Sequence, residues 1–175
     1  CPCCRSGRLR DEFSRALVCP GCGAAYPLRE GFADLLPGLS QARSLPQLAM
    51  ESGFVISIYD SLLWRRNPLL QVFMGLSFEQ EADLILGALE VKGGDIVLDL
   101  ACGTGILGRR IASRVPESLI VGIDLSVPML SYASGRYDEQ GTRERLLIHA
   151  DAQDLPLEDA SVDAALCAGA LHLFP

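Results

Sequence analysis

The sequence lacks a long apolar run. The longest apolar segments of the 175 residues are far too short to span a bilayer. A basic segment followed by an apolar stretch, the pattern of a signal peptide, is also missing. Because the first residue is Cys and not Met, we expect that the sequence has been trimmed, which leaves open a lost leader.

An excess of basic residues is missing too. The formal net charge is −7, which disfavours a polyanion-binding surface over the whole chain. Residues 1–45 hold six Arg against four acidic residues, whereas residues 46–175 hold nine basic against eighteen acidic residues. Any contact with nucleic acid is therefore expected through residues 1–45. Their net charge of +2 is only weak support for such a contact.

The cysteines do not form the pattern of a secreted disulfide framework. Such a framework spreads its cysteines along the chain and favours an even count. Here five of the seven cysteines lie in the first 22 residues. This distribution favours reduced cysteines and an intracellular, cytoplasmic location. Cys102 and Cys167 stand in Gly-rich or apolar context, so we predict that they pack in the interior.

Two C-x-x-C pairs, Cys1 with Cys4 and Cys19 with Cys22, are separated by fourteen residues. Four thiolates at this spacing can surround a Zn²⁺ ion tetrahedrally. We predict that residues 1–37 form a zinc-ribbon module with short strands at 15–19 and 24–28, because so small a unit needs a metal for stability. A thioredoxin-like redox pair is disfavoured, since the segment lacks a βαβ setting, and Cys3 is a surplus thiol.

Residues 38–77 are predicted to be a linker and a helical segment that caps the next domain. Ser77 begins an amphipathic helix whose apolar residues recur at helical spacing, and Gln80 completes a capping box. From residue 94 on, strands and helices alternate. Strands are predicted at 96–101, 119–124, 145–151 and 162–170, with helices at 106–114 and after Ser126. This order indicates an α/β, Rossmann-like, doubly wound parallel sheet.

A glycine-rich turn follows the first strand of this sheet. Gly103, Gly105 and Gly108 form G-x-G-x-x-G between a strand and a helix, a pattern that lets a ligand approach the backbone closely. Asp124 ends the next strand, nineteen residues after Gly105, in the position that binds a ribose diol. Asp99 precedes the turn by four residues. A carboxylate there would repel a pyrophosphate but attract an ammonium group, which favours S-adenosylmethionine over a dinucleotide.

The stretches "VLDLACGTG", "VGIDLSVPML" and "HADAQDLPLEDASVDAALCAGALHLFP" resemble class I S-adenosylmethionine-dependent methyltransferases. They are most similar to the branch of ubiquinone and menaquinone biosynthesis, also known as methyltransferase type 11. The resemblance covers roughly residues 78–175, the predicted cofactor-binding domain. It implies a seven-stranded sheet of which only the first four strands are present, so we expect the natural protein to continue for roughly 80–100 residues.

The same resemblance implies the cofactor-binding residues. Those around the methionyl part are Asp99, Ala101, Gly103 and Gly105; those around the adenosine are Asp124 at the ribose, Leu125, Met129, Asp151 and Ala152; and Ala168 and Gly169 line the methyl-transfer side. His172 lies where a catalytic residue near the methyl acceptor is expected. Tyr59, with Arg65 or Arg66, would cover the methionyl group, although an amphipathic helix with solvated Arg side chains explains these residues equally well. His149 is predicted to be a structural strand residue.

The stretch "LVCPGCGAAYPLREGFADLLP" resembles the zinc modules of 23S ribosomal RNA guanine-N1 methyltransferases, which usually present three Cys and one His. Taken together, these features predict an S-adenosylmethionine-dependent methyltransferase with a structural Zn²⁺ and a small-molecule acceptor, a quinone precursor or a secondary metabolite. The first alternative is an rRNA guanine-N1 methyltransferase that holds RNA with the zinc module. The second is a non-catalytic partner protein that retains the fold. The oligomeric state is not predicted.

Overall fold

The computed structural model describes residues 1–5, 7–12, 15–36, 77–171 and 174. The N-terminal strands are β1 (Arg10–Glu12), β2 (Ala16–Val18), β3 (Ala25–Arg29) and β4 (Phe32–Asp34). They are followed by α5 (Phe78–Leu89), β5 (Ile96–Leu100), α6 (Ile106–Arg114), β6 (Leu119–Asp124), α7 (Val127–Glu139), β7 (Arg145–His149) and β8 (Ala164–Leu166). The predicted linker and cap segment lies almost entirely outside the described residues.

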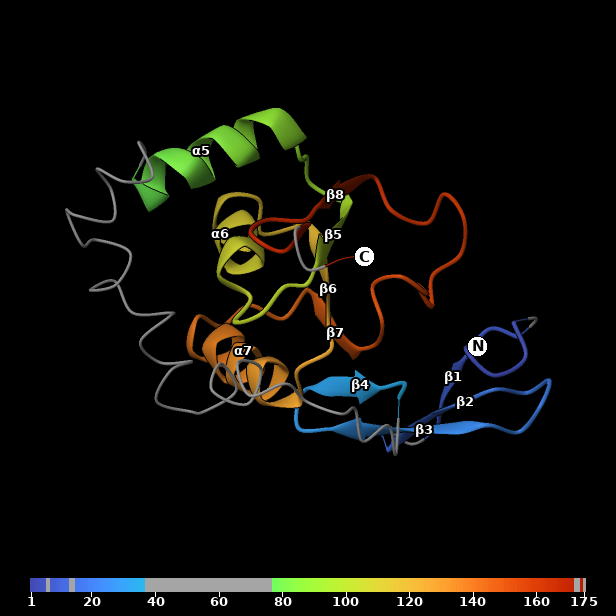
Figure 1. The fold of residues 1–175 in the computed structure, drawn as a ribbon. Helices are drawn as coiled ribbons and strands as arrows, with labels where there is room; N and C mark the ends of the chain where they lie inside the picture. Colours follow the sequence, from blue (N-terminus) through green and yellow to red (C-terminus); the bar gives the residue numbers. More distant parts are fainter. Residues whose placement is uncertain (6, 13–14, 37–76, 172–173, 175) are drawn as a thin grey trace.

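The strands form one sheet in the order β1-β2-β3-β4-β7-β6-β5-β8 (Figure 1). The main sheet contains four parallel neighbours, β7, β6, β5 and β8. Helices α6 and α7 connect β5 to β6 and β6 to β7, and a loop long enough for a parallel crossover connects β7 to β8. This arrangement confirms the predicted α/β, Rossmann-like fold and its four parallel strands. Within the part of the chain that the structure describes, every helix is too short or too polar to cross a membrane.

Helix α5 begins at the predicted capping box. The Ser77 hydroxyl accepts a hydrogen bond from the Gln80 amide at 3.3 Å, and the Gln80 side chain accepts one from the Ser77 amide at 2.9 Å. Ion pairs of Glu79 with Arg110 and of Asp83 with Arg114 join α5 to α6. The cap therefore fixes where the helix starts, and these pairs hold it beside the helix that follows the glycine turn.

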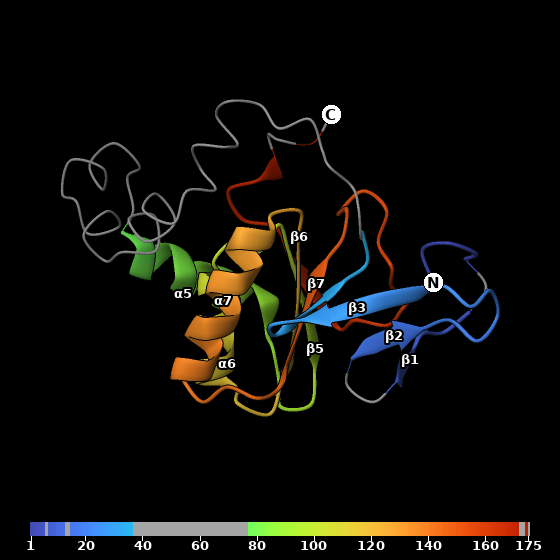
Figure 2. The same ribbon diagram turned by 90° about the horizontal axis from the view of Figure 1, so that it is seen from below.

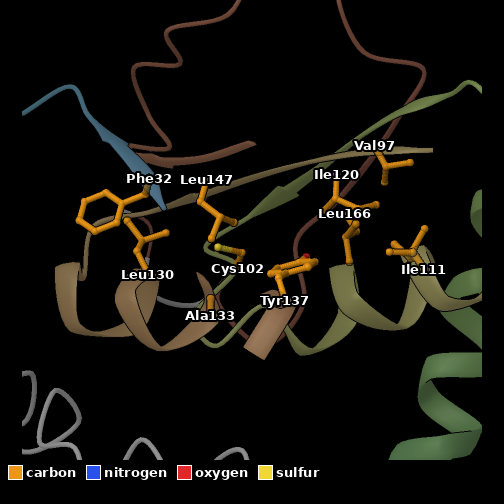
Figure 3. Close-up of a cluster of buried hydrophobic side chains, with 11 residues drawn as sticks. Phe32, Val97, Cys102, Ile111, Ile120, Leu130, Ala133, Tyr137, Leu147 and Leu166 are labelled. Atoms are coloured by element: carbon orange, nitrogen blue, oxygen red, sulfur yellow. The ribbon is translucent and has the colours of Figure 1, made fainter. Parts of the chain in front are cut away.

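The two faces of the sheet are covered differently. Helices α5, α6 and α7 lie on one side, and strands β1–β3 extend away on the other (Figure 2). Val97, Ile120 and Leu147 point to the helical side, where they pack with Leu130 and Tyr137 of α7 (Figure 3). The alternate strand residues point to the second side, toward apolar residues of the N-terminal strands and of the loop between β7 and β8. Both faces are thus buried, as near-continuous apolar strands predict.

Strand β4 joins the N-terminal module to the main sheet. β1, β2 and β3 form an antiparallel meander, and the predicted strands in 15–19 and 24–28 are confirmed as β2 and β3. β4 then pairs antiparallel with β3 and parallel with β7, with Ala33 opposite Ile148. The sequence did not predict β4, since three residues are too few to show a strand pattern. The consequence is a single sheet that runs through both parts of the chain.

Candidate functional site

The carboxyl ends of the parallel strands meet at one edge of the sheet. The register pairs Leu100 with Ile123 and Asp124 with His149, so β5, β6 and β7 end at nearly the same level. Strand β8 lies on the other side of β5 from β6. The chain runs from β5 outward to β6 and β7 and then returns to β8 on the other side of β5, so the strand order reverses at β5, the position at which α/β sheets bind ligands. The residues predicted to bind the cofactor follow these strand ends.

The glycine turn between β5 and α6 needs backbone angles that side chains disfavour. Ala101, Gly103 and Gly105 have φ angles of 53°, 54° and 69°. A Cβ at Gly103 would meet nothing within 4 Å, whereas one at Gly105 would lie 2.9 Å from the Tyr137 ring. At Gly108, which has an ordinary helical φ, a Cβ would lie 2.3 Å from the Tyr137 hydroxyl. The first glycine thus leaves open space above the turn, and the other two permit close packing below it.

Asp124 connects the glycine turn to the end of β6. Its Oδ2 accepts a hydrogen bond from the Gly103 amide at 2.7 Å, and its Oδ1 accepts one from the Ser126 amide at 2.8 Å. Burial raises the pKa of this carboxyl, and the bonds from Ser126 and Gly103 oppose that shift. Each oxygen retains a lone pair. Asp124 is therefore held in place with acceptor capacity left for the hydroxyls of a ribose.

Asp99 lies beneath the turn. It is 4% exposed, and its Oδ2 accepts a hydrogen bond from the Gly108 amide in the first turn of α6, at 3.2 Å. Burial, with the nearby charge of Asp124, raises the pKa of Asp99 to about 7. The carboxyl thus faces the start of the helix. Its predicted contact with the methionyl ammonium stays a prediction.

The other predicted cofactor residues follow the strands at the same edge. Leu125 is 39% exposed, and Met129 in the first turn of α7 is 8% exposed. Asp151 accepts a hydrogen bond from the Gln153 amide at 2.9 Å, which shapes the loop after β7. Ala152 is partly buried in that loop, and Ala168 is partly buried after β8. Their roles toward a cofactor stay predictions.

Several predicted residues lie outside the described part of the chain. These are Tyr59, Arg65 and Arg66 of the cap segment, and His172. Conversely, sequence reasoning missed Tyr137, which is 1% exposed and supports the glycine turn. Its spacing from Leu130 and Ala133 on one helical face could have revealed it.

The four predicted metal ligands lie together at the N-terminal end of the chain. The Sγ atoms of Cys1, Cys4, Cys19 and Cys22 all lie within 4.8 Å of one another. The Cys1–Cys22 and Cys4–Cys19 sulfur pairs are 3.8 Å and 3.7 Å apart. A tetrahedron of four Zn–S bonds requires sulfur separations of about 3.8 Å. The donor set and its geometry therefore fit a Zn²⁺ ion, and the exposed Cys3 is not part of the cluster.

Two backbone turns bring the sulfur atoms of the four cysteines together. The Arg5 amide donates to the Cys1 carbonyl at 2.9 Å, and the Gly23 amide donates to the Cys19 carbonyl at 2.8 Å, so each pair stands on a tight turn. A Cβ at Gly7 would lie 2.5 Å from the Cys19 sulfur. The absence of a side chain at Gly7 is thus required for the cluster.

A hollow of about 880 Å³ lies between the N-terminal module, the second face of the sheet and the loop 154–162. Arg5 is ion-paired with Asp154 and Arg8 with Glu158, so both pairs join the module to that loop. None of the predicted cofactor residues that the structure describes lines this hollow. We therefore place the candidate cofactor site at the strand ends and not in the hollow, because the backbone angles and carboxylates that a nucleoside needs are there.

Comparison with known proteins finds methyltransferases among the relatives of this chain. Residues 97–175 match a family described as a methyltransferase domain. A demethylmenaquinone methyltransferase of Thermus thermophilus is 41% identical over 81 residues, 46% of this chain and 36% of that protein. An uncharacterised methyltransferase of Mycobacterium tuberculosis is 34% identical over 90 residues, 51% of this chain and 43% of that protein. This chain thus spans less than half the length of these curated relatives.

A solved structure is similar as well. The crystal structure of a putative methyltransferase from Bacillus halodurans has a TM-score of 0.50 and 26% identity, and the match covers 54% of this chain and 40% of that one. Residues 97–175 are thus similar to methyltransferase domains in sequence, and the fold of this part of the chain is similar to that of the Bacillus halodurans protein.

Proposed function

We propose that the whole protein transfers a methyl group from S-adenosylmethionine to a small molecule, a quinone precursor or a secondary metabolite. The observation that carries this proposal is the position of Asp124. Its carboxylate is held by the amides of Gly103 and Ser126 at the edge where three strands end. A fixed carboxylate beside the open backbone at Gly103 matches a ribose diol that lies against the backbone.

Bound S-adenosylmethionine would supply a methyl group on a sulfonium, which an acceptor can displace in line. The task of the protein is then to position the two reactants and to exclude water. Asp124 would accept hydrogen bonds from the ribose, and the open space at Gly103 would admit the methionyl part. Leu125 and Met129 would pack against the adenosine, with Asp151 and Ala152 at the adenine.

A base is needed only if the acceptor must lose a proton. His172 is our candidate for that role and lies outside the described residues. Ala168, after β8, would line the side from which the acceptor approaches. Tyr59 would close the methionyl end from the cap segment.

A small acceptor is favoured over RNA by the ion pairs of the N-terminal module. Arg5 and Arg8 are paired with acidic residues of the loop 154–162, and Arg29 is paired with Asp34. Arginines that are already paired are less available for phosphates. The name of the Thermus thermophilus relative, a demethylmenaquinone methyltransferase, supports the same class of acceptor.

The N-terminal module would hold a structural Zn²⁺ through Cys1, Cys4, Cys19 and Cys22. A closed set of four thiolates leaves no open position for catalysis, so the metal would act on stability. Tyr26 lies in the second layer, since its hydroxyl is 3.5 Å from the Cys1 sulfur and accepts from the Cys3 amide at 3.2 Å. The proposed role of the module is to extend the sheet, not to bind RNA.

The acceptor class is tested by transfer of a radiolabelled methyl group on the full-length protein. Extracted demethylmenaquinol and a mixture of secondary-metabolite phenols would be compared with ribosomal RNA lacking the guanine-N1 methyl group. We expect label in the organic phase and none in RNA. Label that appears only in RNA would overturn the choice of acceptor, and absence of transfer to any of the three would overturn the assigned acceptor classes.

A further inference from the structure

The N-terminal module places one buried carboxylate against the cofactor domain. The Oδ1 of Asp34 on β4 lies 2.7 Å from the Nδ1 of His149 on β7, and the two side chains are 3% and 10% exposed. The other carboxylate oxygen accepts from the Arg29 Nε at 2.6 Å. A buried polar pair costs stability unless every group has a partner, and here each oxygen of Asp34 has one.

These contacts fix how the imidazole is protonated. A carboxylate that accepts from Arg29 is ionised, and an ionised carboxylate can only accept hydrogen bonds. The Nδ1 of His149 must therefore carry a proton. Asp34 thus sets both the orientation and the donor of His149, although 115 residues separate the two in the sequence.

The register of the sheet then connects His149 to the candidate site. Asp34 lies opposite His149, and His149 lies opposite Asp124, so the three residues stand in one row across β4, β7 and β6. Neighbours in such a row are about 5 Å apart and point to the same face of the sheet. The backbone follows the same row, since the Leu35 amide donates to the His149 carbonyl at 3.1 Å and the Ala150 amide to the Asp124 carbonyl at 3.3 Å.

His149 is therefore a proton-bearing ring between two carboxylates. The charged groups that face it are Asp34 with its partner Arg29 on one side and Asp124 on the other. Burial raises the pKa of Asp124, and the charge of His149 is among the influences that lower it. When it is charged, the imidazole thus favours the ionised form of Asp124, the form that accepts hydrogen bonds at both oxygens.

We infer that Asp34 and His149 form a positioning pair that supports the neighbouring Asp124 as an ionised acceptor for the ribose hydroxyls, so that β4 of the N-terminal module contributes to the cofactor site. This inference rests on the proposed function. The module would thus have a role beyond its proposed zinc site, because Asp34 on β4 orients His149 beside the candidate cofactor site. Asp34 and His149 act through Asp124 and are positioning residues.

The inference is tested by affinity for two ligands, S-adenosylhomocysteine and its 2′,3′-dideoxy analogue, measured by calorimetry on the full chain. Asp34→Asn removes the charge that orients His149. His149→Asn retains a donor toward Asp34 but cannot carry charge. We expect both variants to bind S-adenosylhomocysteine about tenfold more weakly and to bind the analogue as the wild type does. Asp159→Asn, in the exposed loop after β7, is the matched control and should change neither affinity.

Equal losses for both ligands would overturn the inference, since a merely structural role would not depend on the hydroxyls. Wild-type protein that binds neither ligand would instead overturn the proposed function. If the variants do not fold, the imidazole nitrogens of wild-type His149 give a second measurement by NMR. Their resonances should report a protonated Nδ1 and should move when S-adenosylhomocysteine is added; resonances that do not move would contradict the inference.

Discussion

At the residue scale, the glycines of the turn serve different physical purposes. Gly103 adopts φ 54° with open space around its missing side chain, while Gly105 and Gly108 are crowded by Tyr137. The first residue is thus suited to a ligand and the others to packing. The same turn includes Ala101 at φ 53°, a non-glycine residue in a conformation that costs roughly 1–2 kcal/mol. Such strain is typical of a backbone shaped for binding.

Gly103→Ala should separate binding from stability. An alanine in the left-handed backbone conformation should lower the unfolding free energy by about 1 kcal/mol. The added methyl group should also enter the space for the cofactor and lower the affinity for S-adenosylmethionine by more than tenfold. Gly141→Ala is the matched control, because Gly141 has φ 70° and equally open surroundings at the far end of α7. It should lose the same stability with unchanged affinity. Urea unfolding and calorimetry give the two values; unchanged affinity in Gly103→Ala would contradict the site.

Asp99 should make stability depend on pH. Its pKa in the folded protein, about 7, is above its usual value of 3.8, mainly because of burial. The folded state therefore binds the proton more tightly, so this group lowers stability progressively as pH rises from about 4 to 7. Asp99→Asn should be more stable than wild type at pH 8, by about 1 kcal/mol or more, with the advantage vanishing near pH 4. Urea unfolding at both pH values tests this; an equal difference at both would contradict it.

These residues also show what the sequence could predict at this scale. The spacing of Gly103, Gly105 and Asp124 identified the turn and its acidic partner, since the pattern is local. The direction in which Asp99 points was not predictable, because it depends on how α6 starts over the strand. His149 was interpreted as structural, and its partner Asp34 was missed, since only the register of β4 and β7 brings them together.

At the element scale, short sequence patterns predicted the features that depend on residues close together in the chain. Ser77 and Gln80 predicted the start of α5, and the two C-x-x-C pairs predicted that the four cysteines lie together. Both depend on residues close in sequence. Strand β4 has no such signal, and its place in the sheet follows from a parallel pairing with β7 that no short pattern encodes.

The cluster of four cysteines should bind zinc, and removal of one of these cysteines should abolish that binding. We expect stoichiometric zinc in the wild-type protein and little in Cys19→Ser, since the buried Cys19 sulfur is surrounded by the other three ligands. Cys3→Ser is the matched control, because Cys3 is exposed and outside the cluster. Elemental analysis by mass spectrometry gives the metal content. A Cys19→Ser protein with full zinc would exclude the ligand set.

At the scale of the whole molecule, the N-terminal module and the α/β domain share one sheet and one core. Phe32 of β4 lies beside Leu130 and Leu147 on the helical face, within the buried cluster that extends to Tyr137 (Figure 3). The ion pairs of Arg5 and Arg8 with the loop after β7 join the two parts on the other face. The sequence predicted a zinc ribbon and a sheet domain but not this continuity, which depends on contacts between distant residues.

Because of this shared core, the two parts should unfold together. Phe32→Ala should lower the unfolding free energy of the whole protein by about 3–5 kcal/mol, within one calorimetric transition. Leu84→Ala, at a position that is 62% exposed on α5, is the control and should cost less than about 0.5 kcal/mol. Two separate transitions, with only the smaller one shifted by Phe32→Ala, would mean that the module is an independent unit.

The central claim, that the strand ends around Asp124 bind S-adenosylmethionine, is tested most directly by calorimetry on the full-length protein. We predict saturable binding by the wild type, affinity at least tenfold lower for Asp124→Ala, and unchanged affinity for the control Asp159→Ala. Absence of binding by the wild type, or equal binding by Asp124→Ala, would contradict the claim.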